Sequence, residues 1–137
     1  MARAVSDVRI RFATADDASL LLQLIRELAA YERAPNAVVA TEEDLRRYGF
    51  GLERQFEALL AFLDGKPAGL ALFYPRFSTW LGRPGVYLED LFVTQAARGK
   101  LPSLSSAAGS GSIFRCLTGT RRAASIAGGA LEILVCR

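Results

Sequence analysis

The chain has 137 residues, 51% of them hydrophobic, which suffices for one domain with a core and argues against overall disorder. The formal net charge of +3 comes from residues 101–137, which hold four arginines and one glutamate, because residues 1–100 hold 13 basic and 13 acidic side chains. That segment has one aromatic residue, Phe114, so we expect no nucleic-acid partner.

The sequence also disfavours a membrane-spanning helix and a metal site. No apolar run reaches the roughly 18 residues that a membrane helix needs, and the amino end has no apolar core of the signal-peptide type. We therefore expect a cytoplasmic protein with no membrane partner. The chain has no histidine, and its two cysteines form no metal-binding pattern, so we expect no metal site.

The first part of the chain predicts a strand and two helices. Residues 8–12 alternate apolar side chains with arginines, which is typical of a half-buried strand. A leucine-rich stripe between residues 20 and 28 predicts a helix that ends at Tyr31 and Glu32, because Pro35 prevents its continuation. A second, shorter helix follows. Near matches to a capping box precede the two helices, in the pairs Thr14 with Asp17 and Thr41 with Asp44.

A hairpin and one further strand come next. Residues 56–63 and 68–77 predict two strands joined by Asp64-Gly65, a pair that tolerates the positive φ of a tight turn. Residues 78–85 contain glycine and proline and predict a loop. Residues 87–93 predict a strand, because their aromatic and aliphatic side chains favour a pleated surface.

Two adjacent carboxylates, Glu89 and Asp90, make this last strand the most site-like part of the chain. Side chains alternate along a strand, so we expect the two carboxylates to point to opposite faces. At least one of them must then meet a partner, a cleft or water. A solvated strand face or a salt bridge would also account for them.

Several segments along residues 1–100 carry a recognisable pattern in a fixed order. They are 10–17, 24–32, 41–45, 48–51 and 85–93, the last followed by Arg98-Gly99-Lys100. In this order they resemble the GCN5-related N-acetyltransferase superfamily, most of all its spermidine/spermine (diamine) acetyltransferases. The resemblance implies an α/β fold with a mixed, mostly antiparallel sheet flanked by helices, truncated here after the central strand, and a homodimer.

The resemblance also implies acetyl-CoA-dependent acetylation of a small primary amine such as a polyamine or diamine. An alkylamine has a pKa of about 10.4, so it arrives protonated and must lose a proton before it attacks. A carboxylate is a suitable relay for that proton. The alternatives are a non-catalytic remnant of such an enzyme, or an acyltransferase of the superfamily with a different amine acceptor.

Site residues follow from the family pattern, position by position. The strand's end would bind the pantetheine arm of acetyl-CoA, and the next turn would bind its pyrophosphate with backbone N–H groups. The carboxylate of Glu89 would be catalytic. The implied cofactor-binding residues are Leu91, Phe92, Val93, Arg98, Gly99 and Lys100, and the implied substrate-binding residues are Tyr31, Glu32, Glu89 and Asp90. For Tyr31 and Glu32, an ordinary helix end is the competing interpretation.

After Lys100 the chain departs from the family pattern. Leu101 and Ser103 stand where the family has glycines, and Pro102 between them has no N–H to donate. No counterpart of the family's late tyrosine follows, and only residues 130–135 predict a strand. We therefore expect residues 1–100 to be the amino-terminal part of a single acetyltransferase domain, and residues 101–137 to be an atypical tail, frameshifted or disordered.

A frameshift would explain this departure. Read in another frame, the codons of residues 114–120 can encode Ser-Val-Leu-Asp-Trp-Asn, which resembles a late segment of the family. A genuine, Gly/Ser-linked flexible tail is the competing explanation.

Sequencing the coding DNA from the Gly85 codon past the stop distinguishes these explanations. We expect another frame to continue Arg-Gly-Lys into Gly-x-Gly, a long helix and a late tyrosine. If none of the three frames does so, the tail is genuine and the frameshift interpretation is wrong.

Overall fold

A computed structural model describes residues 6–80, 82–100, 123–127 and 130–134, with the backbone alone described for 83–86, 123–127 and 130–134. The elements are β1 (Val8–Phe12), the 3₁₀ turn η1 (Ala15–Asp17), α1 (Ala18–Tyr31), α2 (Glu42–Phe50), β2 (Glu57–Leu63), β3 (Lys66–Ser78), β4 (Arg83–Val93), the 3₁₀ turn η2 (Gln95–Ala97), β5 (Ala123–Ala127) and β6 (Ala130–Leu134).

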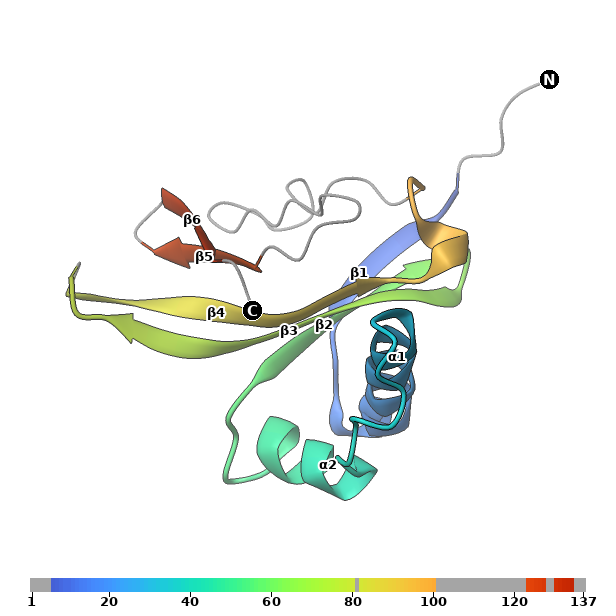
Figure 1. The fold of residues 1–137 in the computed structure, drawn as a ribbon, viewed down its shortest axis with the longest axis horizontal. Helices are drawn as coiled ribbons and strands as arrows, with labels where there is room; N and C mark the ends of the chain where they lie inside the picture. Colours follow the sequence, from blue (N-terminus) through green and yellow to red (C-terminus); the bar gives the residue numbers. More distant parts are fainter. Residues whose placement is uncertain (1–5, 81, 101–122, 128–129, 135–137) are drawn as a thin grey trace.

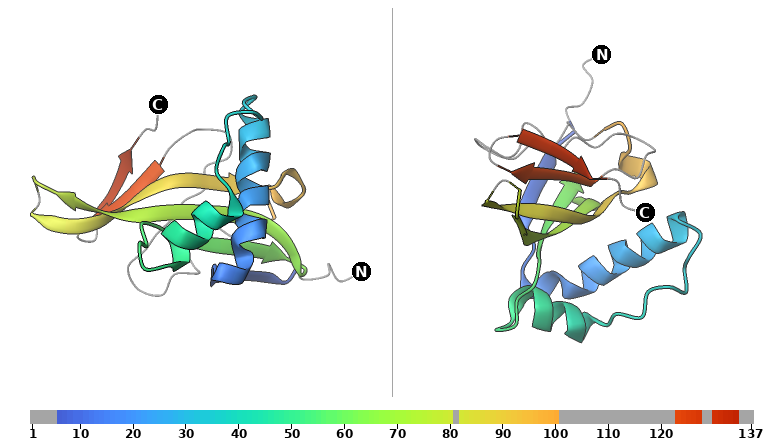
Figure 2. Two further views of the ribbon diagram at one scale, coloured as in Figure 1. Left: turned by 90° about the horizontal axis from the view of Figure 1, so that it is seen from below. Right: turned by 60° about the vertical axis from the view of Figure 1, so that its left-hand side comes forward.

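The first four strands form one sheet in the order β1-β2-β3-β4, with every neighbouring pair antiparallel. Both helices lie on one side of this sheet, and the β5–β6 hairpin lies beside β4 on the other side (Figure 1). Figure 2 shows the same arrangement from two further directions. The predicted fold class, an α/β fold with a largely antiparallel sheet ending after the central strand, is confirmed.

The main core lies between the helices and the sheet. Leu21 and Leu24 of α1 are fully buried, as the leucine stripe predicts, and each such side chain contributes about 1.5–3 kcal/mol through burial. The sheet contributes the facing side of the core. The buried residues of this cluster are Ala18, Leu21, Leu22, Leu24, Leu45, Ala58, Leu60, Leu70, Leu72 and Phe92.

Turn and cap chemistry fixes the ends of the elements as predicted. Asp64 and Gly65 have φ of 51° and 77°, as a two-residue hairpin requires. The Asp44 N–H donates to Thr41 Oγ1 at 3.2 Å, and the Thr41 N–H donates to the Asp44 carboxylate at 2.8 Å, which completes the capping box of α2. Helix α1 ends at Tyr31, also as predicted.

The start of β4 and the number of strands in the tail differ from the prediction. Strand β4 begins at Arg83, within the predicted loop, because the antiparallel pairing with β3 continues as far as the pair Ser78 and Arg83. The proline at position 84 does not prevent this, since β4 is an edge strand of its sheet, where a missing N–H is tolerated. In the tail, β6 matches the predicted strand, but β5 has no clear period-2 pattern and was not predicted.

A partly exposed ion pair joins β1 to the start of the helical layer. The two guanidinium nitrogens of Arg11 donate to the two carboxylate oxygens of Asp17 at 2.7 and 2.9 Å. The Thr14 N–H donates to the same carboxylate at 2.7 Å. The Arg11 hydrogen bond is the largest cause of the low pKa of Asp17, about 2, with further lowering by Thr14.

Asp17→Asn should therefore destabilise the chain by about 1–2 kcal/mol at pH 7. Because the folded-state pKa of Asp17 is lowered, its contribution is present above the unfolded pKa of about 3.9 and is lost as the pH falls through about 2. Urea unfolding at pH 7 and pH 3 measures the difference. Asp16→Asn removes the adjacent exposed charge as a control, and an equal loss in both variants would contradict the prediction.

Candidate active site

The central feature of the candidate site is a β-bulge in β4. Leu72 pairs with Asp90, but the next residue of β3, Phe73, pairs with Leu88, so Glu89 is an extra residue in β4. The bulge interrupts the regular alternation of side chains. The expectation that Glu89 and Asp90 lie on strictly opposite faces assumed an unbroken strand, and that assumption is wrong.

The bulge divides the flanking residues between the two faces of the sheet. Cross-strand partners share a face, so Asp90 lies on the face of Leu72, which belongs to the core under the helices. Leu88 lies on the face of Phe73 and is 2% exposed. A regular strand would place Leu88 and Asp90 on one face. The bulge therefore allows an apolar residue to be buried on one side and a carboxyl group to face the end of α1 on the other.

Backbone groups at the end of β4 point away from β3. The Thr94 N–H donates to the carbonyl of Ala68 at 2.8 Å, and hydrogen-bonded and non-bonded pairs alternate along an antiparallel ladder. Val93, opposite Gly69, and Leu91 are thus in non-bonded positions. Their N–H and C=O groups face the outer edge of β4. Among the described residues no strand is hydrogen-bonded to that edge, although β5 of the separate hairpin packs beside β4.

This alternation distinguishes the three strand residues predicted to bind the pantetheine arm. Leu91 and Val93 have the outward-facing backbone groups that such binding requires. Phe92 lies opposite Leu70, so its backbone groups are directed to β3, and its side chain is buried in the core. Sequence analysis did not resolve this difference.

Gly69 also supports the geometry of this edge. A Cβ atom at Gly69 would lie 2.8 Å from the carbonyl oxygen of Phe92. The close approach of β3 to β4 therefore requires glycine here. A glycine inside a predicted strand is the signal that sequence analysis could have used.

The carboxyl group of Asp90 carries the strongest electrostatic signal at the site. Its pKa is raised to about 6, chiefly because burial disfavours the charged form, and further because Glu89 and Glu32 are negatively charged. None of these effects comes from a basic residue. Glu89 itself is exposed. The arrangement favours binding of a cation.

The end of α1 meets the turn after β4. Tyr31 is 57% exposed, and the guanidinium carbon of Arg98 lies 4.4 Å from the centre of its ring. The Nε–H of Arg98 also donates to the carbonyl of Val93 at 3.3 Å. The structure thus brings a predicted substrate residue into contact with a predicted cofactor residue.

The remaining predicted cofactor residues lie at the described end of this turn. Gly99 has φ of 74°, a conformation that favours glycine, and both Gly99 and Lys100 are exposed. The Lys100 N–H donates to the carbonyl of Ala97 at 3.1 Å, so this backbone donor is used within the turn. Leu101, Pro102 and Ser103, which bear on the predicted pyrophosphate site, lie outside the described residues.

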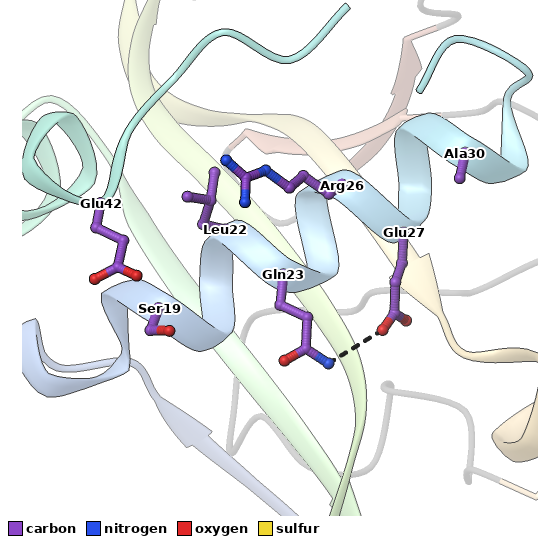
Figure 3. A pocket seen from close by; sticks show the side chains of 7 residues that line it. All are labelled: Ser19, Leu22, Gln23, Arg26, Glu27, Ala30 and Glu42. Carbon is purple, nitrogen blue, oxygen red and sulfur yellow. Dashed lines mark hydrogen bonds between the residues drawn. The ribbon is translucent and has the colours of Figure 1, made fainter. Parts of the chain in front are cut away.

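Figure 3 shows a shallow hollow on the outer side of α1, which shares no lining residue with the predicted site. Its polar side chains include Gln23, whose amide donates to Glu27 at 3.2 Å. Glu42 at its rim pairs with Arg46 at 3.1 Å. These contacts already use polar groups of Gln23, Glu27 and Glu42. The hollow offers no group of unusual chemistry.

Comparison with known proteins was made by sequence and by structure. A thialysine N-epsilon-acetyltransferase from Sus scrofa is 39% identical over 104 residues, covering 70% of this chain and 61% of that protein. The spermidine/spermine N(1)-acetyltransferase-like protein 1 of Homo sapiens is 41% identical over 98 residues, covering 66% of this chain and 14% of that protein. No protein-family model matches the chain.

A solved structure shares the fold. It is an aminoglycoside acetyltransferase from an uncultured soil metagenomic sample, in complex with sisomicin, with a TM-score of 0.56 and 22% identity over 68% of this chain and 60% of that one. In sequence and in fold the chain is therefore similar to N-acetyltransferases, which supports its resemblance to the GCN5-related N-acetyltransferase superfamily. The chain spans 61% of the length of the Sus scrofa relative and 60% of the length of the aminoglycoside acetyltransferase.

Two further properties concern the described residues of the chain. None of its described helices combines the length and apolarity needed to cross a membrane. Among the same residues, no three carboxylate or cysteine side chains are placed to hold a metal ion together.

Asp90→Asn should stabilise the folded chain near pH 8. Because the folded-state pKa of Asp90 is raised, the stability associated with its proton is present below the unfolded pKa of about 3.9 and is lost as the pH rises through about 6. The neutral amide avoids this loss, which amounts to at most about 2 kcal/mol after allowance for solvent screening.

Thermal or urea unfolding from pH 4 to pH 8 measures this difference. The difference in the free energy of unfolding between variant and wild type should nearly vanish at pH 4, where Asp90 of the folded chain is protonated and neutral like the amide. This comparison provides an internal control. A difference in unfolding free energy that does not change with pH would contradict the raised pKa of Asp90.

Proposed function

We propose that this chain binds acetyl-CoA along the outer edge of β4 and transfers the acetyl group to a small primary amine held beside the end of α1. The observation that carries the proposal is the half-buried carboxyl of Asp90, whose neighbours Glu89 and Glu32 are both acidic. A cationic amine would supply the missing counter-charge. The outward-facing backbone groups of Leu91 and Val93 lie one and three residues farther along the same strand.

The structure fits a pantetheine arm in part. Extended ligands that add to a sheet edge use alternate backbone groups, and Leu91 and Val93 provide one such pair. The Val93 N–H is also a suitable donor for the oxygen of the acetyl carbonyl. Acetyl-CoA would supply the activated acetyl group; these residues would orient it and hold it at the strand.

The carboxylates would divide two tasks. Asp90 and Glu32 would attract the cationic amine. Glu89 would accept the proton that the ammonium group loses before its nitrogen attacks the thioester, directly or through water, because Glu89 is exposed and can release that proton to solvent. CoA would leave as the thiolate and take up a proton from solvent. Asp90 is less suited to this step, since a bound cation lowers its pKa and keeps it ionised.

The names of the two relatives support a small amine as acceptor, and a polyamine or diamine is the acceptor class that we propose. A homodimer and a cytoplasmic location remain predictions from the sequence. The alternative is a non-catalytic remnant that folds poorly, or that binds a partner through the exposed sheet edge, and that does not turn over.

Acetylation of spermidine by variants tests the division of tasks. Glu89→Gln should lower kcat by about 10²–10⁴-fold with little change in KM for the amine, as expected for loss of a proton acceptor. Asp90→Asn should chiefly raise that KM. Glu43→Gln removes an exposed carboxylate from α2 and serves as a matched control.

A wild-type kcat in Glu89→Gln would refute its role. Absence of turnover in a wild-type chain that melts cooperatively would favour the non-catalytic alternative. Rates across small diamines and peptides would identify a different acceptor class.

A further inference from the structure

Arg98 folds back onto the site instead of extending from the turn. Its guanidinium stacks on the ring of Tyr31 at 4.4 Å, and its Nε–H donates to the Val93 carbonyl at 3.3 Å. The side chain therefore spans the gap between the end of α1 and the outer edge of β4. These two elements are far apart in sequence, and the stack brings their ends together.

The turn holds Arg98 in this position. The Ala97 N–H donates to the carbonyl of Thr94 at 3.0 Å, and Ala97 is 2% exposed. Gly99 follows with φ of 74°, so the backbone reverses immediately after Arg98. A buried residue on one side and a reversal on the other restrict where the arginine side chain can lie.

We infer that Arg98 is a latch that closes the outer edge of β4 against Tyr31 in the unliganded chain. This inference rests on the proposed function, because the ligand that opens the latch is the pantetheine arm. An extended ligand on that edge would need the Val93 backbone and the space along it, so the arginine side chain must move. As a specificity-determining residue, Arg98 then favours ligands whose own contacts with the displaced guanidinium offset the loss of its stack on Tyr31.

Acetyl-CoA can offset the cost of displacing Arg98, whereas pantetheine cannot. Arg98 begins the turn predicted to meet the pyrophosphate, and a guanidinium released from Tyr31 can pair with a phosphate group. Pantetheine has no phosphate, so it loses the stack and gains no ion pair. The latch therefore predicts opposite effects of removing Arg98 on the two ligands.

Titration calorimetry of the full chain with CoA and with pantetheine tests the latch. Arg98→Ala should weaken CoA binding and tighten pantetheine binding about two- to fivefold, the range expected for a stack at an exposed site. Tyr31→Ala should tighten pantetheine binding similarly without weakening CoA, because the arginine is kept. Tyr31→Phe retains the ring and should match wild type for pantetheine.

Lys100→Ala is the matched control for charge, because it removes a cation from the same turn. It should weaken CoA binding and leave pantetheine binding unchanged. If Arg98→Ala behaves in the same way, Arg98 is only a phosphate-binding residue and the latch is refuted. If CoA binds but no variant binds pantetheine, the latch also fails. If neither ligand binds wild type or any variant, the proposed cofactor site fails as well.

Discussion

The bulge at Glu89 is the constraint on which the rest of the site depends. Strand β4 must bury Leu88 on one face of the sheet and Phe92 on the other, while it presents Asp90 towards α1. A regular strand of this sequence would put Leu88, Asp90 and Phe92 on one face. One extra residue resolves this conflict locally, so the core under the helices and the candidate site form on the same strand.

The electrostatics of the site follow from that placement. Asp90 is partly buried on the core face of β4, and the charges of Glu89 on its own strand and Glu32 at the end of α1 raise its pKa further. Elsewhere in the described chain, carboxylates such as Asp17 have an arginine partner. Asp90 instead lies beside like charges. This arrangement favours binding of a cation at Asp90.

Much of the fold follows from local sequence, and much of the site does not. The leucine stripe, the capping pair Thr41 and Asp44, and the Asp64-Gly65 turn each act within a few residues, so their outcome could be predicted. The bulge depends on the register between β3 and β4, which the sequence of neither strand states. The Tyr31–Arg98 contact joins residues far apart in the chain, so no local pattern could reveal it.

Gly69 gives the site an unusual dependence on a residue with no functional group. Its missing side chain leaves room for the carbonyl of Phe92, and any other amino acid would push β4 away from β3 at the point where Leu91 and Val93 turn their backbone outward. Mutational tolerance at this position should therefore follow steric size rather than polarity or charge. Under the proposed function, a survey of inactivating substitutions would find Gly69 alongside the acidic residues, although it contributes no atom to the chemistry.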